Sequence, residues 1–379
     1  MPYITIRQTP RCHQLTYDDI ISREWAVQMT QDTSWDRKTS VTVTRFRDVI
    51  EEEMLIRTPI SEMINALRVF NIKYKPLFDA NRHDLYYEFH IPKRSGGLRK
   101  ISAPNDPLMK ALRELKEIFE NQFSALYHTS AYAYVEGRST IDAIRRHQAN
   151  DSKWFLKTDC SDFFGSTSHE FIMRMLSMIY PFSEVMKRND GNQELRRAVD
   201  LCMLDGGLPQ GTPISPMLTN LVMIPIDHTI ANALRKRGFI YTRYADDMMI
   251  SHKKSFMFTH MVKEINDIFV KFHAPYTLKR EKTRYGSRNG ANWNLGVMLN
   301  KDNQITIGDR KRDNFRGMAS NFIESVQNKR PWEIRDIQIF SGLISYYLMV
   351  EPDFVNNLRA TYQRKFGMDF VKAARDMLR

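Results

Sequence analysis

The sequence is poor in cysteine and has no long apolar run. Its three cysteines, Cys12, Cys160 and Cys202, lie far apart and form no CxxC pair, which indicates free thiols in a reducing compartment. Its ten histidines show no metal-ligand spacing, and internal repeats and low-complexity stretches are absent. No apolar run approaches the roughly 18 residues of a membrane span, and the first residues lack the apolar core of a signal peptide. We therefore expect a cytoplasmic protein that does not contact a membrane.

The chain carries an excess of positive charge. It has 56 Lys and Arg residues against 44 Asp and Glu residues, a formal net charge of +12. Such an excess favours a polyanionic partner, although basic proteins without one are common. With 379 residues, 42% of them hydrophobic, the chain can bury a sizeable core in one large domain or in two to three subdomains.

Helix and strand patterns are mixed without a regular βαβ alternation, which predicts the α+β class. Helical spacing of apolar residues covers 58–70, 108–123, 171–180, 215–238 and 313–379. Thr167 to Glu170 is typical of a capping box, and Pro225 is expected to kink the helix that follows Ser215. Strand patterns cover 86–103, 154–159, 239–251 and 295–307, three of them with the turn chemistry of hairpins.

Three aspartates lie at the ends of apolar strands. Asp246 and Asp247 occupy the tip of the hairpin over 239–251, and Asp159 ends an earlier strand. Bringing unpaired carboxylates together is costly unless a cation lies between them. Mg²⁺ takes carboxylate oxygens, and two such ions about 3.5–4 Å apart can activate a 3′-hydroxyl and stabilise a leaving pyrophosphate. The alternative is an Asp-Asp β-turn and an unrelated aspartate.

Seven segments, in order from about Tyr74 to the C-terminus, resemble the motifs of bacterial reverse transcriptases. They are IPKRSGGLRKISAP (91–104), AYVEGRST (133–140), FLKTDCSDFF (155–164), GLPQGTPISPMLTN (207–220), RYADDMMIS (243–251), LKREKTRYG (278–286) and WNLGVMLN (293–300). The resemblance implies a right-hand polymerase with fingers, a palm whose antiparallel sheet carries the Tyr-Ala-Asp-Asp turn, and a helical thumb. It divides the chain into an N-terminal extension (1–57), fingers with the start of the palm (58–150), palm with part of the fingers (151–312) and thumb (313–379).

The same resemblance implies roles for individual residues. Asp159 and Asp246 would coordinate two Mg²⁺ ions, for which Mn²⁺ can substitute, and Asp247 would support them. Phe164 would pack against the sugar of the incoming nucleotide and leave no room for a 2′-hydroxyl, which favours deoxynucleotides. Further substrate contacts are implied for Lys93, Arg94, Arg99, Gln210, Gly211 and Lys282, the last as the acid that protonates pyrophosphate. Contacts with template or primer are implied for Lys100, Arg138, Tyr244, Arg284, Arg310 and Lys311. The plainer alternatives are a core phenylalanine, a simple turn at Gln210-Gly211 and solvated cations.

The implied reaction is RNA-directed DNA synthesis from dNTPs on a DNA or RNA primer, with an RNA template that can be a dedicated noncoding RNA. A homo-oligomer or an effector protein is a further candidate partner. Too few residues follow the last hairpin for an RNase H domain, so we expect RNA–DNA hybrids to stay intact. Two other readings remain open: template-independent or protein-primed DNA synthesis, and a catalytically silent RNA-binding scaffold.

Two features depart from the retron enzymes within this family. Asp142-Ala143 precedes His147 at the wrong spacing for Asn-Ala-x-x-His, and the last hairpin has no Val-Thr-Gly. The sequence therefore favours a solitary enzyme of the antiviral defence or abortive-infection type, from a bacterium or a phage.

Overall fold

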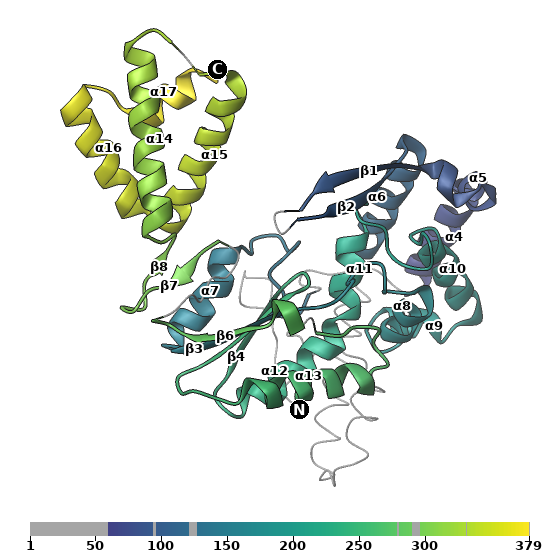
Figure 1. Cartoon of the computed structure of the whole chain (residues 1–379). Helices are drawn as coiled ribbons and strands as arrows, with labels where there is room; N and C mark the ends of the chain where they lie inside the picture. The colour runs from purple at the N-terminus through teal and green to yellow at the C-terminus, as the bar shows by residue number, and fades with distance from the viewer. Residues whose placement is uncertain are drawn as a thin grey trace, which may run out of the picture.

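The computed structural model describes residues 60–93, 96–120, 127–278, 280–289, 296–330 and 332–378. Figure 1 shows a helical lobe with a long hairpin, a central sheet with helices packed on it, and a second helical lobe at the C-terminal end. This mixture confirms the predicted α+β class. The N-terminal extension over 1–57 lies outside the described residues and remains a prediction.

The first lobe is built on a helix and a hairpin that the sequence pattern predicts. Its elements are α4 (Ile60–Lys73), α5 (Lys75–Asp79), the 3₁₀ helix η1 (Arg82–Leu85), β1 (Tyr86–Pro92), β2 (Leu98–Pro104) and α6 (Asp106–Glu120). Helix α4 buries Ile64, Leu67 and Phe70, which recur at helical spacing. Strands β1 and β2 pair along their whole length, and Gly96 and Gly97 between them adopt positive φ.

The central sheet has the strand order β4-β5-β3-β6, and each neighbouring pair is antiparallel. Its strands are β3 (Trp154–Asp159), β4 (Ile240–Tyr244), β5 (Asp247–His252) and β6 (Arg284–Ser287). Because side chains alternate along a strand, the two faces of the sheet enter different cores. Leu156 and Met248 lie in the main core, whereas Phe155 and Met249 lie in a second core with helix α7 (Thr140–Ala149) and the C-terminal lobe.

A run of helices joins β3 to β4. It comprises α8 (His169–Leu176), α9 (Phe182–Met186), α10 (Asn189–Asp200), α11 (Ser215–Val222) and α12 (Ile224–Arg235). The predicted capping box at Thr167 is wrong, because Thr167 Oγ1 donates to Phe163 O at 2.7 Å while Ser168 caps α8. The helix expected from Ser215 is divided in two, with Pro225 in the first turn of the second helix.

The C-terminal lobe is a helical unit with an aromatic core. Helix α13 (Phe258–Lys271) and the 3₁₀ helix η2 (Arg280–Lys282) precede it, followed by the small hairpin of β7 (Met298–Leu299) and β8 (Ile305–Thr306). The lobe itself contains α14 (Asp309–Gln327), α15 (Ile334–Val350), α16 (Pro352–Phe366) and α17 (Phe370–Asp376). Phe315, Phe322 and Phe340 are fully buried between these helices. Over the described ranges, every helix is too short or too polar to cross a membrane.

Candidate active site

The three aspartates meet at one end of the central sheet. Asp159, the last residue of β3, is the register partner of Asp247, the first residue of β5. Asp246 lies in the two-residue turn between β4 and β5, and its carbonyl oxygen accepts a hydrogen bond from Cys160 N at 3.0 Å. Backbone pairing therefore fixes the three residues next to one another, on strands that are far apart in the sequence.

The turn that carries Asp246 is a tight hairpin connection. Tyr244 and Asp247 pair across it, which leaves Ala245 and Asp246 as its two central residues. Ala245 has a φ of +57°, a value that a residue with a Cβ rarely adopts. Positive φ at the first central residue is typical of the primed turns that join twisted strands. The strain is local to the site, where such outliers often occur.

Negative charge is crowded at this edge. Burial, followed by the neighbouring Asp159 and Asp247 carboxylates, raises the pKa of Asp246 to about 6. Burial also raises the pKa of Asp247, and the nearby Lys157 ammonium counteracts that rise. Burial is thus the main cause of both rises, and the neighbouring carboxylates add to the rise of Asp246.

Two ammonium groups lie against the carboxylates. Lys282 Nζ is 2.8 Å from Asp159 Oδ2, and Lys157 Nζ is 3.4 Å from Asp247 Oδ1. A hydrogen bond of 3.0 Å between the hydroxyls of Thr158 and Thr283 joins β3 to the segment that carries Lys282. The lysines mark positions where positive charge is favourable, and a set of carboxylate oxygens is what hard divalent cations prefer. The residues therefore fit a divalent metal centre.

Phe164, the predicted contact with the sugar, lies next to the loop of Gln210 and Gly211, which is predicted to bind the nucleotide. Phe164 O accepts hydrogen bonds from Thr167 N and from Leu208 N, the latter at 3.0 Å, which places the loop containing Gln210 beside Phe164. The Phe164 ring is partly buried and packs edge-on against Phe163 at a centroid distance of 5.7 Å. Phe164 is therefore not a plain core residue, and its contact with a sugar stays a prediction.

In the structure, Gly211 has strand β2 as its close neighbour, whereas the motif implies a nucleotide there. Its φ is +119°, and a Cβ there would lie 2.9 Å from Ile101 Cγ2 and 3.0 Å from Ser102 O. Ser102 N donates to Gln210 O at 2.8 Å, which joins the loop to β2. The glycine is needed because the hairpin strand approaches the loop so closely.

The basic residues predicted from the motifs have different surroundings. Lys93 and Arg99 are exposed at the outer end of the β1–β2 hairpin, whereas Arg94 lies outside the described residues. Lys100 Nζ is already 2.7 Å from Glu88 Oε1. Arg138 Nη1 donates to His128 O and Ala131 O, both at 2.7 Å, which is a structural role that the motif did not predict.

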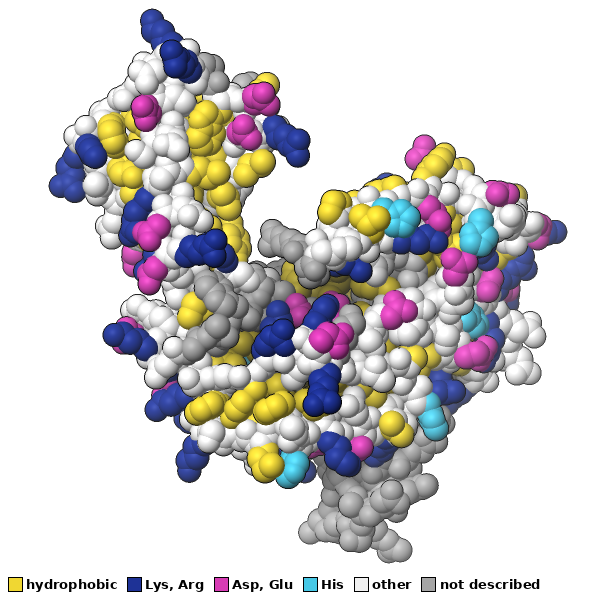
Figure 2. Space-filling model, in the orientation of Figure 1, with side chains coloured by type: hydrophobic (Ala, Val, Ile, Leu, Met, Phe, Trp, Pro, Cys, Tyr) yellow, Lys and Arg dark blue, Asp and Glu magenta, His cyan; other side chains and the backbone are white. Residues whose placement is uncertain are grey.

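The remaining predicted contacts lie along the sheet edge and the start of the C-terminal lobe. Tyr244 is half-buried beside the turn, and Arg284 Nη1 donates to Glu281 O at 2.6 Å. Arg310 is exposed, and Lys311 Nζ donates to Gly296 O at 2.5 Å. None of these positions tests a contact with nucleic acid, so those roles stay predictions. Figure 2 shows basic and acidic side chains gathered on the central lobe, below the gap between the two outer lobes.

Two residues of this site were missed by motif reasoning. Lys157 could have been found, because it lies two residues before Asp159 on one strand and therefore on the same face. Tyr134 lies in the segment AYVEGRST (133–140), but the resemblance of that segment implied no role for it. It adopts a φ of +59°, and burial followed by the nearby Asp246 and Tyr244 raises its pKa. Tyr134 thus comes from a distant loop to lie beside the carboxylates.

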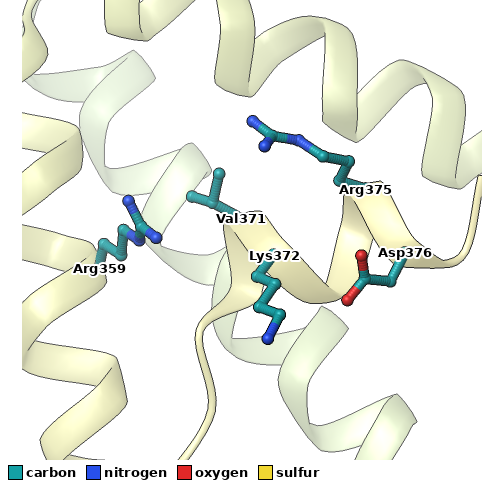
Figure 3. Close-up of a pocket in the computed structure, with 5 residues that line it drawn as sticks. All are labelled: Arg359, Val371, Lys372, Arg375 and Asp376. Atoms are coloured by element: carbon teal, nitrogen blue, oxygen red, sulfur yellow. The ribbon is translucent and has the colours of Figure 1, made fainter.

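Two other features of the surface lie apart from this edge. His83, Glu88 and Asp205 form an exposed cluster of metal-type ligands, but Lys100 already pairs with its two carboxylates. A hollow of about 310 Å³ lies in the C-terminal lobe. Figure 3 shows the residues that line it, Arg359, Val371, Lys372, Arg375 and Asp376. Neither feature contributes a group to the three aspartates.

Comparison with known proteins decides the family. Residues 91–308, more than half of the chain, match the family model described as reverse transcriptase (RNA-dependent DNA polymerase). The chain belongs to the reverse transcriptase family. The enzyme is thus an RNA-directed DNA polymerase with the right-hand fold, and the boundaries predicted for its fingers, palm and thumb stay predictions.

The reverse transcriptases that this chain resembles include several retron enzymes. It is 26% identical to the retron Ec83 reverse transcriptase of Escherichia coli over 298 residues, which are 76% of this chain and 89% of that protein. It is 27% identical to the retron Mx65 reverse transcriptase of Myxococcus xanthus over 319 residues, 81% of this chain and 70% of that protein. These relatives support a retron-like enzyme and do not support the preference for a solitary type.

A solved telomerase structure shows a weaker likeness. Telomerase from Candida albicans, in complex with a fragment of telomeric RNA, aligns with 76% of this chain and 66% of its own, at 11% identity and a TM-score of 0.45. That likeness carries no argument about this reverse transcriptase.

The first departure from the retron pattern, at Asp142 and His147, has a structural explanation. Asp142 completes a capping box with Ser139 at the start of α7, where an asparagine could not reproduce the charge. His147 is fully buried, and its ring nitrogens lie 2.5 Å from Ser251 Oγ and 2.8 Å from Thr242 Oγ1. Asp142 thus caps α7, and His147 fixes α7 against β4 and β5.

Proposed function

We propose that this reverse transcriptase copies an RNA template with two Mg²⁺ ions held by Asp159, Asp246 and Asp247. The observation that carries the proposal is the pairing of Asp159 with Asp247 beside the Asp246 turn. Mg²⁺ is favoured over softer metals because every candidate ligand is a carboxylate oxygen. The ions would supply charge that activates the primer 3′-hydroxyl and neutralises the triphosphate.

The residues of the chain would position the substrates around that charge. Asp159 and Asp246 would face the reacting phosphate, with Asp247 more distant, at the end of its strand. Lys282 would leave its ion pair with Asp159 and turn its ammonium toward the departing pyrophosphate, to which it can give a proton. Arg99 and Lys93, exposed on the hairpin, would bind the triphosphate as the hairpin folds inward.

The template is proposed to be a dedicated noncoding RNA of a bacterial or phage retroelement or antiphage defence system. Support comes from the similarity to retron reverse transcriptases and from the net charge of +12, which favours a polyanionic partner. Sequencing the nucleic acid that copurifies with the enzyme tests this point. We expect one enriched RNA with DNA complementary to part of it, and a random sample of cellular RNA would contradict the proposal.

The chemistry is tested by incorporation of labelled dNTPs on a primed RNA, with and without Mg²⁺. We expect incorporation that requires both template and metal, and that Asp246→Asn abolishes. Single dNTPs without template form the second arm, because product held covalently on the protein would indicate protein-primed synthesis instead. Incorporation that persists in Asp246→Asn would rule out the proposed carboxylates.

A further inference from the structure

Next to the Tyr244–Asp247 turn, which we call the catalytic turn, lies a buried arginine that has no part in the proposed chemistry. Arg243 is 1% exposed, although it carries a full positive charge. Its Nε and Nη2 donate to Asp227 of α12, with Nη2 at 2.7 Å from Oδ2. Tyr241 Oη donates to the same carboxylate at 2.8 Å. A buried ion pair of this kind often adds little net stability compared with apolar packing, so its role has to be sought in what it orders.

The third nitrogen of this guanidinium reaches the turn itself. Arg243 Nη1 donates to Ala245 O at 3.0 Å and to Asn220 Oδ1 at 3.1 Å. Ala245 is the residue at positive φ, and its carbonyl belongs to the peptide unit that leads into Asp246. The hydrogen bond thus holds the strained peptide that leads into Asp246 in its observed orientation.

The same arginine also joins the loop that carries Tyr134. Its backbone pairs with that loop, since Arg243 N donates to Ser130 O at 2.7 Å and Tyr132 N donates to Arg243 O at 2.8 Å. Asn220 Nδ2 in turn donates to Ala133 O at 2.8 Å. The side chain of Arg243 therefore connects α11, α12 and the catalytic turn, and its backbone connects the loop that carries Tyr134.

We infer that Arg243 is a positioning residue that sets the geometry of the metal-binding turn through the Ala245 carbonyl. It touches neither substrate nor metal and acts through Asp246. The inference rests on the proposed metal site. It predicts that removing the hydrogen bond from Arg243 to Ala245 O weakens the binding of metal ions even when no nucleotide or template is present.

The test is binding of Mn²⁺ to the full chain without substrates, measured by electron paramagnetic resonance, together with thermal unfolding. Arg243→Lys keeps the charge beside Asp227 but offers one nitrogen where three act. We expect its Mn²⁺ affinity to fall about tenfold, with a matching rise in the Mg²⁺ concentration that half-saturates synthesis and with the KM for dNTP nearly unchanged.

Tyr241→Phe is the matched control, because it removes a hydrogen bond to the same Asp227 carboxylate without touching the turn. It should lower the unfolding temperature and leave Mn²⁺ affinity unchanged. Equal ion affinity in Arg243→Lys and Tyr241→Phe would overturn the inference, whatever their stabilities.

Two further variants keep the outcome decisive. If Arg243→Lys does not fold, Asn220→Ala replaces it, since it removes the second acceptor of Nη1, and we expect twofold to fivefold weaker Mn²⁺ binding. Affinity equal to that of Tyr241→Phe would again count against the inference. Asp159→Asn tests the metal site separately, because unchanged Mn²⁺ binding there would defeat the proposed function and leave the role of Arg243 no basis.

Discussion

Asp159 and Asp247 lie directly opposite each other on the antiparallel strands β3 and β5. Like charges at such positions destabilise a sheet, because their side chains leave the same face at close range. At this edge of the sheet, the ammonium groups of Lys157 and Lys282 offset the repulsion between the two carboxylates. The pairing of these two aspartates therefore depends on nearby positive charge.

The two aspartates should differ in importance. Asp159→Asn is expected to reduce the rate of nucleotide addition by more than about 100-fold. That loss is larger than the one caused by removing a residue that only contacts a metal ligand. Asp247→Asn should reduce it less, because its carboxylate lies beside Lys157 and serves as a support. Single-turnover addition of one dNTP at several Mg²⁺ concentrations measures both, with circular dichroism as the control for folding. A larger loss in Asp247→Asn would reverse the assignment.

Stability without metal should depend on pH through Asp246. Its pKa in the folded chain, about 6, lies above the ordinary value of 3.8, so the folded state binds that proton more tightly than the unfolded state. The resulting stabilisation is complete below about pH 4 and is lost as the pH rises through 6. In EDTA, Asp246→Asn should unfold roughly 2 °C above the wild type at pH 7.5, and the gap should narrow as the pH falls and close below about pH 4. A gap that does not change with pH would contradict this expectation.

Lys157 should compete with metal. Replacing it by methionine keeps the apolar stem and removes the ammonium 3.4 Å from Asp247. We expect Mn²⁺ to bind about fivefold more tightly, because one repelling charge near the site is gone. Lys153→Met is a suitable control, since Lys153 precedes β3 at the far end from Asp159. Equal effects in the two variants would mean that only the net charge matters.

Phe164 should set the choice of sugar. Phe164→Ala opens space next to the loop of Leu208 and Gln210, and we expect the preference for dNTP over rNTP to fall by at least about tenfold. The ratio of kcat/KM for the two nucleotides is the measurement. Phe163→Leu, at the buried neighbour, is the control and should lower stability without changing the ratio. An unchanged ratio in Phe164→Ala would assign that ring to packing alone.

The sequence predicts the parts of the site that reside in local pattern. Alternation and turn chemistry placed Asp159 at the end of an apolar strand and Asp246 in a hairpin turn, whereas the proposal that they meet came from the resemblance to reverse transcriptases. Apolar spacing predicted helix α4, and the Gly96-Gly97 turn predicted the β1–β2 hairpin. The structure confirms both elements. Ser168 was missed as the helix cap because a neighbouring threonine has the same local chemistry.

The rest depends on register between distant segments, which local pattern does not encode. The partnership of Arg243 with Asp227 requires α12 to lie against β4, and the loop that carries Tyr134 lies near Asp246 because Ala131 of that loop pairs with Arg243. Arg138 was assigned to nucleic-acid binding from its motif, and the structure adds a structural role, since its Nη1 donates to two backbone carbonyls. Charge alone did not distinguish the two roles.

The bond between Ser102 N and Gln210 O has a mechanical consequence. It ties the base of the hairpin to the palm at a place where Gly211 allows almost no clearance, so the hairpin cannot swing there as a whole flap. Bending is restricted to the ribbon beyond Ser102, whose outer end carries Arg99. Any movement of Arg99 toward a nucleotide would therefore have to come from the few residue pairs beyond Ser102 and not from the whole hairpin.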